Sequence, residues 1–101
     1  MDLGEKIKSL RMEKDATLHE VSMGTDIDMT LLSKIERGER LPTKEQVKKI
    51  AKYYNFDFEK LTIELTAAKI INEYGINDIT YQAANLVKET ISTYNRRKIN
   101  A

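Results

Sequence analysis

Apolar residues recur every three to four positions along most of this chain of 101 residues. Leu3, Ile7 and Leu10, for example, stand at positions i, i+4 and i+7. Side chains with this spacing lie on one face of an α-helix. No alternation typical of a β-strand is sustained. We therefore predict an all-α fold of five to six helices, at about residues 2–14, 17–24, 28–37, 43–54, 57–74 and 78–94.

Residues typical of helix ends support these boundaries. Thr17 and Glu20 have the spacing of a capping box, in which each side chain binds the backbone amide of the other residue. Asp28 is a preferred N-cap residue, and we expect free amides at the start of its helix to attract phosphate. Gly38 suits the position just after that helix. A second capping box begins at Thr43.

The two short helices between residues 17 and 37 are joined by a tight turn around Asp26. Aspartate tolerates the left-handed backbone that such a turn needs. The apolar residues expected where the two helices cross are Val21, Ile27, Leu32 and Ile35. The residues left on the outward face of the second helix are Met29, Thr30, Ser33 and Lys34. This arrangement is a helix-turn-helix, whose second helix fits the major groove of DNA.

The two C-terminal helices are apolar on more than one side. Along the first of them, one row holds Phe58, Leu61, Leu65 and Ala68, and another holds Ile63, Ala67, Ile70 and Tyr74. A helix with two apolar sides usually contacts two neighbours. We predict a domain boundary at residue 61, followed by a helical hairpin over residues 62–101 that forms a homodimer. The expected interface residues are Ile70, Tyr74, Leu86 and Ile91; the alternative is a monomer that closes its own core.

Composition narrows the possible classes of protein and the kinds of site that it can hold. The chain holds 17 Lys and Arg residues against 16 Asp and Glu, so a DNA-binding surface needs its basic side chains gathered on one face. With no cysteine and a single histidine, His19, we expect no catalytic residues, no metal site, no cofactor and no small-molecule ligand. The first residues lack the apolar stretch of a signal peptide, and no segment suits a membrane. We expect a cytoplasmic protein.

The sequence resembles the Cro/cI-type (XRE) helix-turn-helix family over about residues 3–61. The resemblance rests on three segments: Leu3-Gly-Glu-Lys-Ile-Lys-Ser-Leu-Arg11, Leu32-Ser-Lys-Ile-Glu-Arg-Gly-Glu-Arg-Leu-Pro-Thr43, and Val47 to Leu61. It implies a lambda-repressor-like five-helix DNA-binding domain, here with a C-terminal helical extension. The chain departs from the family where Asp26 replaces a frequent glycine and Leu18 a frequent glutamine.

The resemblance also implies a role for each site residue. The base-contacting positions are Met29, Thr30, Ser33 and Lys34. The phosphate-contacting positions are Thr17, Leu18, Arg37 and Arg40. Arg11 and Glu36 match a structural ion pair between the first and third helices.

We therefore predict a transcriptional regulator that binds double-stranded DNA sequence-specifically, as a dimer on a pseudo-palindromic operator. A phage-type repressor, a controller of a restriction–modification system and an antitoxin-like protein all remain open. The alternative is a protein-interaction adaptor on the same fold that does not bind DNA. Near-neutral charge and the apolar C-terminal segment favour the adaptor, whereas the outward set with Arg37 opposes it.

Overall fold

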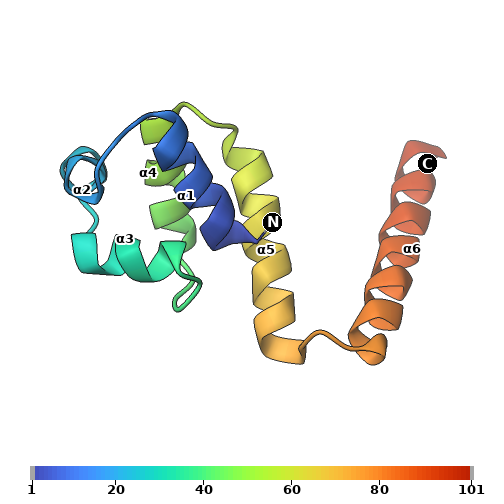
Figure 1. The fold of residues 1–101 in the computed structure, drawn as a ribbon. Coiled ribbons are helices and arrows are strands. Elements are labelled where there is room, and N and C mark those ends of the chain that lie inside the picture. The colour runs from blue at the N-terminus through green and yellow to red at the C-terminus, as the bar shows by residue number, and fades with distance from the viewer. Residues whose placement is uncertain (1, 101) are drawn as a thin grey trace. The chain divides into compact units, whose positions relative to one another are not determined.

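The computed structural model describes residues 2–100, which form six α-helices and no β-strand (Figure 1). The helices are α1 (Leu3–Glu13), α2 (Leu18–Thr25), α3 (Met29–Glu36), α4 (Lys44–Tyr54), α5 (Phe58–Tyr74) and α6 (Asp78–Asn100). The predicted all-α fold is confirmed. The predicted end of the last helix at Tyr94 is wrong, because α6 continues to Asn100. No glycine or proline interrupts residues 95–100, and their arginines and lysine favour a helix.

Side-chain caps determine where the helices begin. Thr17 Oγ1 accepts a hydrogen bond from the backbone nitrogen of Glu20 at 3.1 Å, and Glu20 Oε1 accepts from the nitrogen of Thr17 at 3.0 Å. The same reciprocal pair joins Thr43 and Gln46 at the start of α4. Both predicted capping boxes are therefore present. Each one satisfies a backbone donor that has no partner within the helix.

The chain divides into two compact units, one up to Lys69 and the other from Ile70. The core of the first unit is made of Leu3, Ile7, Ala16, Val21, Ile27, Leu32, Ile35, Val47, Ile50, Ala51, Leu61 and Leu65. Helix α3 packs on α1 and α2, and α2 packs on α4. Leu61 and Leu65, which belong to one of the two apolar rows noted along α5, lie in this core. This unit extends beyond residue 61 because Leu65 belongs to the same core.

Gly4 sets how closely α1 approaches the end of α3. A Cβ atom at this position would lie 2.6 Å from the carbonyl oxygen of Ile35 and 2.8 Å from that of Glu36. Real Cβ atoms essentially never come so near to a backbone oxygen. Only glycine therefore fits between the two helices without displacing one of them.

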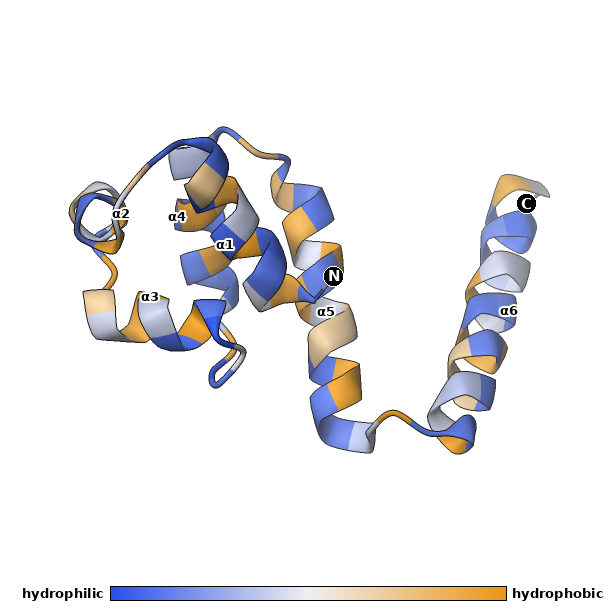
Figure 2. Cartoon of the chain, in the orientation of Figure 1, coloured by the Kyte–Doolittle hydropathy of each residue, from blue (hydrophilic) through white to orange (hydrophobic). Residues whose placement is uncertain are grey.

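The second unit exposes much of its apolar surface. Figure 2 shows hydrophobic residues spaced along α6 among hydrophilic ones. In α6, Ile79, Val87 and Ile91 are all more than half exposed, and their spacing places them on one side of the helix. This unit therefore buries little apolar surface of its own. None of the described helices combines the length and apolarity needed to cross a membrane.

Candidate nucleic-acid interface

A left-handed residue makes the turn between α2 and α3. Asp26 has φ 57° and ψ 35° and caps the end of α2, where its nitrogen donates to the carbonyl of Ser22 at 2.9 Å. The Ser22 hydroxyl donates in turn to the carbonyl of Ile27 at 2.6 Å. Aspartate adopts this backbone region more readily than most residues. The turn between the two helices is thus built with aspartate.

The two helices cross over a buried apolar contact, and Figure 1 shows α2 end-on while α3 runs across the view. The residues predicted at this crossing, Val21, Ile27, Leu32 and Ile35, are at most 4% exposed. Because this side of α3 is sequestered in the core, its other side faces solvent.

The outward side of α3 carries the four residues predicted to contact bases. Met29, Thr30 and Lys34 are exposed, and Ser33 is half-buried. Together they offer two hydroxyls, one ammonium group and one thioether. Hydroxyl and ammonium groups can hydrogen-bond base edges in a major groove, and an apolar side chain can contact a thymine methyl group.

The N-terminus of α3 differs from our expectation of free amides. Asp28 Oδ1 accepts hydrogen bonds from the backbone nitrogens of Thr30, at 2.8 Å, and Leu31, at 3.3 Å. The N-cap carboxylate therefore already occupies the donors that we expected to attract phosphate, and it adds a negative charge there. Asp28 stabilises the helix at the expense of an anion site.

The N-terminus of α2 brings together two predicted phosphate contacts with different surroundings. Thr17 is exposed, and although its oxygen accepts from Glu20, its hydroxyl hydrogen remains free to donate. The Leu18 side chain packs against the core, so that residue has only its backbone amide for a phosphate. The hydrogen bonds from Thr17 lower the pKa of Glu20, so this carboxylate stays charged at neutral pH.

The segment after α3 holds the other two predicted phosphate contacts. Arg40 is exposed. Arg37 donates to Glu39 Oε2 from Nε, at 2.9 Å, and from Nη2, at 2.7 Å. Its third nitrogen, Nη1, donates to the hydroxyl of Ser33. A predicted phosphate contact and a predicted base contact are thus joined through one guanidinium group.

Glu39 was not among the residues singled out from the sequence. Acidic and basic residues two positions apart do not meet on a helix, so helical spacing gave no reason to pair Arg37 with Glu39. The signal that pointed to it was Gly38, which predicts that the chain reverses direction immediately after α3.

Arg11 and Glu36 form an ion pair between α1 and the end of α3. Arg11 Nε lies 2.8 Å from Glu36 Oε2, and Nη2 lies 3.0 Å from Oε1. The two side chains are only 16% and 7% exposed. Hydrogen bonding to Glu36 raises the pKa of Arg11, despite the burial that opposes its charge. The pair fixes the position of α3 on the rest of the unit rather than offering a free charge to DNA.

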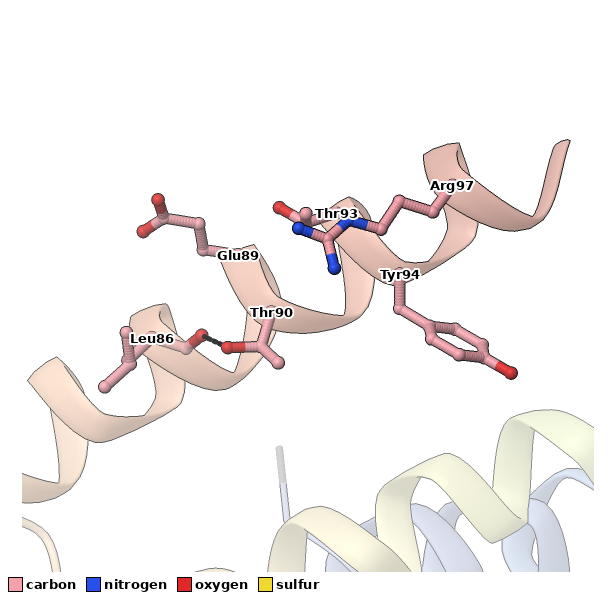
Figure 3. Close-up of a pocket in the computed structure, with 6 residues that line it drawn as sticks. All are labelled: Leu86, Glu89, Thr90, Thr93, Tyr94 and Arg97. Atoms are coloured by element: carbon pink, nitrogen blue, oxygen red, sulfur yellow. Dashed lines mark hydrogen bonds between the residues drawn. The ribbon is translucent and has the colours of Figure 1, made fainter. Parts of the chain in front are cut away.

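The four residues predicted at a dimer interface are all exposed. Ile70 and Tyr74, near the end of α5, are 43% and 67% exposed, and Leu86 and Ile91 in α6 are 65% and 54% exposed. Figure 3 shows Leu86 beside a shallow hollow of α6, with the hydroxyl of Thr90 donating to its carbonyl at 2.9 Å. Tyr94 and Arg97 line the same hollow.

Comparisons with known proteins agree with this geometry. A model of the helix-turn-helix family matches residues 7–61. The crystal structure of the clp gene regulator ClgR from Corynebacterium glutamicum is similar, with a TM-score of 0.56 and 20% sequence identity. That similarity covers 92% of this chain and 88% of the other, and it concerns the fold. A search of curated protein sequences finds no match.

The family match spans more than half of the chain and includes α2, the turn and α3 in full. The family is one of DNA-binding transcription regulators and not of enzymes. The chain belongs to the Cro/cI-type helix-turn-helix family and is a DNA-binding transcriptional regulator.

Proposed function

We propose that this protein binds a pseudo-palindromic DNA operator as a homodimer, with α3 of each subunit in the major groove. The observation that carries the proposal is the polar outward side of α3, formed by Thr30, Ser33 and Lys34, in a chain of this family. A groove-binding helix needs one side held in the core and the other free. The buried crossing of α2 and α3 meets that requirement.

Each site residue has a distinct part in this proposal. Lys34 donates to guanine through its ammonium group, and Met29 covers a thymine methyl group. The hydroxyls of Thr30 and Ser33 bind neighbouring base edges. Thr17 and the Leu18 amide on one side, with Arg37 and Arg40 on the other, bind the phosphates that flank the groove and set the orientation of α3.

The dimer in this proposal is supported by the exposed apolar residues of the second unit. Ile70, Tyr74, Leu86 and Ile91 would lose contact with water if a second copy covered them. Two-fold symmetry would then place the two α3 helices about 34 Å apart, one turn of DNA.

Regulation in this proposal follows from occupancy of the operator. A bound dimer excludes RNA polymerase where the operator overlaps a promoter, and it recruits polymerase where the operator lies beside one. A phage-type repressor, a restriction–modification controller and an antitoxin-like protein all use such a mechanism.

Selection from a random pool of DNA duplexes tests this function. The selected duplex is then titrated with the protein at about 50 mM and about 200 mM salt. We expect a pseudo-palindrome with half-sites one helical turn apart and binding that weakens as salt rises. No enrichment by a folded helical protein would refute the proposal and favour the protein-interaction adaptor.

A further inference from the structure

All three nitrogens of the Arg37 guanidinium already have partners in the protein. Nε and Nη2 donate to a single carboxylate oxygen of Glu39, at 2.9 and 2.7 Å, and Nη1 donates to the hydroxyl of Ser33. Arg37 and Glu39 are nonetheless 55% and 56% exposed, so the pair lies at the surface. These bonds use three of the five N–H donors of the guanidinium, and Glu39 occupies its Nε–Nη2 edge. A DNA phosphate that approaches Arg37 along this edge must therefore compete with Glu39.

The backbone after α3 places Glu39 against Arg37. Gly38 has φ 74°, a left-handed conformation that glycine adopts without strain. The nitrogen of Gly38 donates to the carbonyl of Ile35 at 3.1 Å, and the nitrogen of Glu39 donates to that of Lys34 at 2.9 Å. This is a Schellman motif, which turns the chain back over the last turn of the helix. The motif holds the Glu39 backbone in place and keeps its carboxylate within reach of the guanidinium.

We propose that Glu39 occupies the phosphate-binding group of Arg37 and thereby lowers the affinity of the protein for DNA. The inference rests on the proposed function, in which Arg37 contacts a phosphate. A carboxylate and a phosphate both match the planar donors of a guanidinium group. Glu39 acts as an internal substitute for the phosphate. After a phosphate displaces Glu39 from Arg37, the Glu39 carboxylate remains as a negative charge beside that phosphate.

The Arg37–Glu39 ion pair is weak enough for a phosphate to replace Glu39. An exposed ion pair contributes little to stability because water screens its charges, so a phosphate can displace Glu39 without unfolding the turn. The same exchange reaches α3, because Arg37 also donates to Ser33. When Arg37 moves toward a phosphate, the Ser33 oxygen is released for a base. Glu39 thus links phosphate binding to the availability of a base-facing hydroxyl.

Replacing Glu39 by glutamine tests the proposal on the full-length protein and its selected operator. Glu39→Gln keeps the side-chain size but removes the charge that holds Arg37. The control is Glu59→Gln, which removes the same charge from an exposed residue of α5 outside the helix-turn-helix. At about 50 mM salt we expect Glu39→Gln to bind about two- to tenfold more tightly than the control, with a steeper loss of affinity as salt rises.

Two further variants distinguish competition between Glu39 and phosphate for Arg37 from simple repulsion of DNA by the Glu39 charge. Arg37→Gln removes the contested group, and Arg37→Gln/Glu39→Gln completes a double-mutant cycle. Competition predicts that Glu39→Gln gains little affinity once Arg37 is absent. An equal gain in both backgrounds, or a gain matched by Glu59→Gln, would overturn the inference while leaving the proposed function intact. Failure of the wild-type chain to select any duplex would instead refute the proposed function and, with it, this inference.

Discussion

Arg11 donates to both carboxylate oxygens of Glu36, and this contact fixes the first helix to the helix proposed to read DNA. The same guanidinium donates from Nη1 to the carbonyl of Ala16, just before α2, at 3.0 Å. One side chain therefore joins three segments of the first unit. Because both partners are largely buried, neither charge can be solvated well if the other is removed.

Removing both members of this pair should destabilise the fold by less than the sum of the two single removals. We expect Glu36→Gln to lower the free energy of unfolding by about 1–3 kcal/mol, because Arg11 keeps a buried charge without its partner. Arg11→Met/Glu36→Gln should cost less than the sum of the two single changes. Urea denaturation of all four proteins at one concentration measures both effects. Strictly additive losses would mean that the two side chains contribute independently.

Lys34 should contribute to both the affinity and the sequence preference of DNA binding. We expect Lys34→Ala to weaken binding to the selected operator by about 1–3 kcal/mol and to relax the preference at one base pair of each half-site. Lys8→Ala removes the same charge from an exposed position of α1 and is the matched control. If both variants weaken binding equally at every sequence, Lys34 contributes charge alone and reads no base.

A charge on the apolar side of α6 should prevent dimerisation. Ile91→Glu would bury a carboxylate in the proposed interface, so we expect the dimer dissociation constant to rise about tenfold or more. Ser92→Glu adds the same charge one residue further on, about 100° around the helix, and should have little effect. Sedimentation over a range of concentrations measures the dimer. A monomeric wild-type protein, or equal effects of the two variants, would contradict the proposed interface.

The hydroxyl of Tyr54 is buried without a hydrogen-bond partner among the described residues. Burial raises the pKa of this group above its ordinary value of 10.0. Since an unpartnered buried hydroxyl is costly, Tyr54→Phe should leave the stability at neutral pH unchanged or raise it by about 1 kcal/mol.

The raised pKa also predicts a pH dependence. Above about pH 10 the unfolded chain ionises at Tyr54 while the folded chain resists ionisation, so the stability contributed below that pH is lost as the pH rises. Tyr54→Phe should lose less stability over this range, whereas Tyr53→Phe, a change in the adjacent ring, should behave like the wild type. Thermal melts between pH 8 and about pH 11 test this. If stability falls with pH equally in the wild type and both variants, Tyr54 is not the source of this pH dependence.

The two glycines next to α3 should respond to alanine for different reasons. Gly4→Ala inserts a methyl group against backbone oxygens of α3 and should cost about 1–3 kcal/mol. Gly38→Ala meets no atom within 4 Å and is opposed only by its φ of 74°, at about 1 kcal/mol. Because Gly4→Ala pushes α3 away, it should also weaken operator binding in stable, folded protein. A Gly4→Ala variant of wild-type stability would show that α1 can shift freely.

Several features of the site were predictable because they depend on neighbouring residues. The capping box at Thr17 and the N-cap at Asp28 follow from residue types spaced within one helical turn. The left-handed turn at Asp26 also follows from a local preference. The buried and exposed sides of α3 follow from the periodicity of its apolar residues. In each case the physical cause acts over a few residues.

Other features depended on the path of the chain in space. The use of the Thr30 amide by Asp28 required the rotamer of the cap, and it removed an expected anion site. The contact of Arg37 with Glu39 required the turn at Gly38, and no pairing rule for helices predicts it. The end of α6 at Asn100 was missed because apolar periodicity stops before the helix does.

The sequence by itself determined the all-α class, the capping boxes at Thr17 and Thr43, and the buried sides that make α2 and α3 a helix-turn-helix, since these follow from propensity and periodicity within short segments. Only the tertiary structure decided that Gly4 lies against the backbone of Ile35 and that Arg37 is shared between Ser33 and Glu39. Those contacts depend on distances of a few ångströms between side chains and backbone, which packing sets and sequence spacing does not.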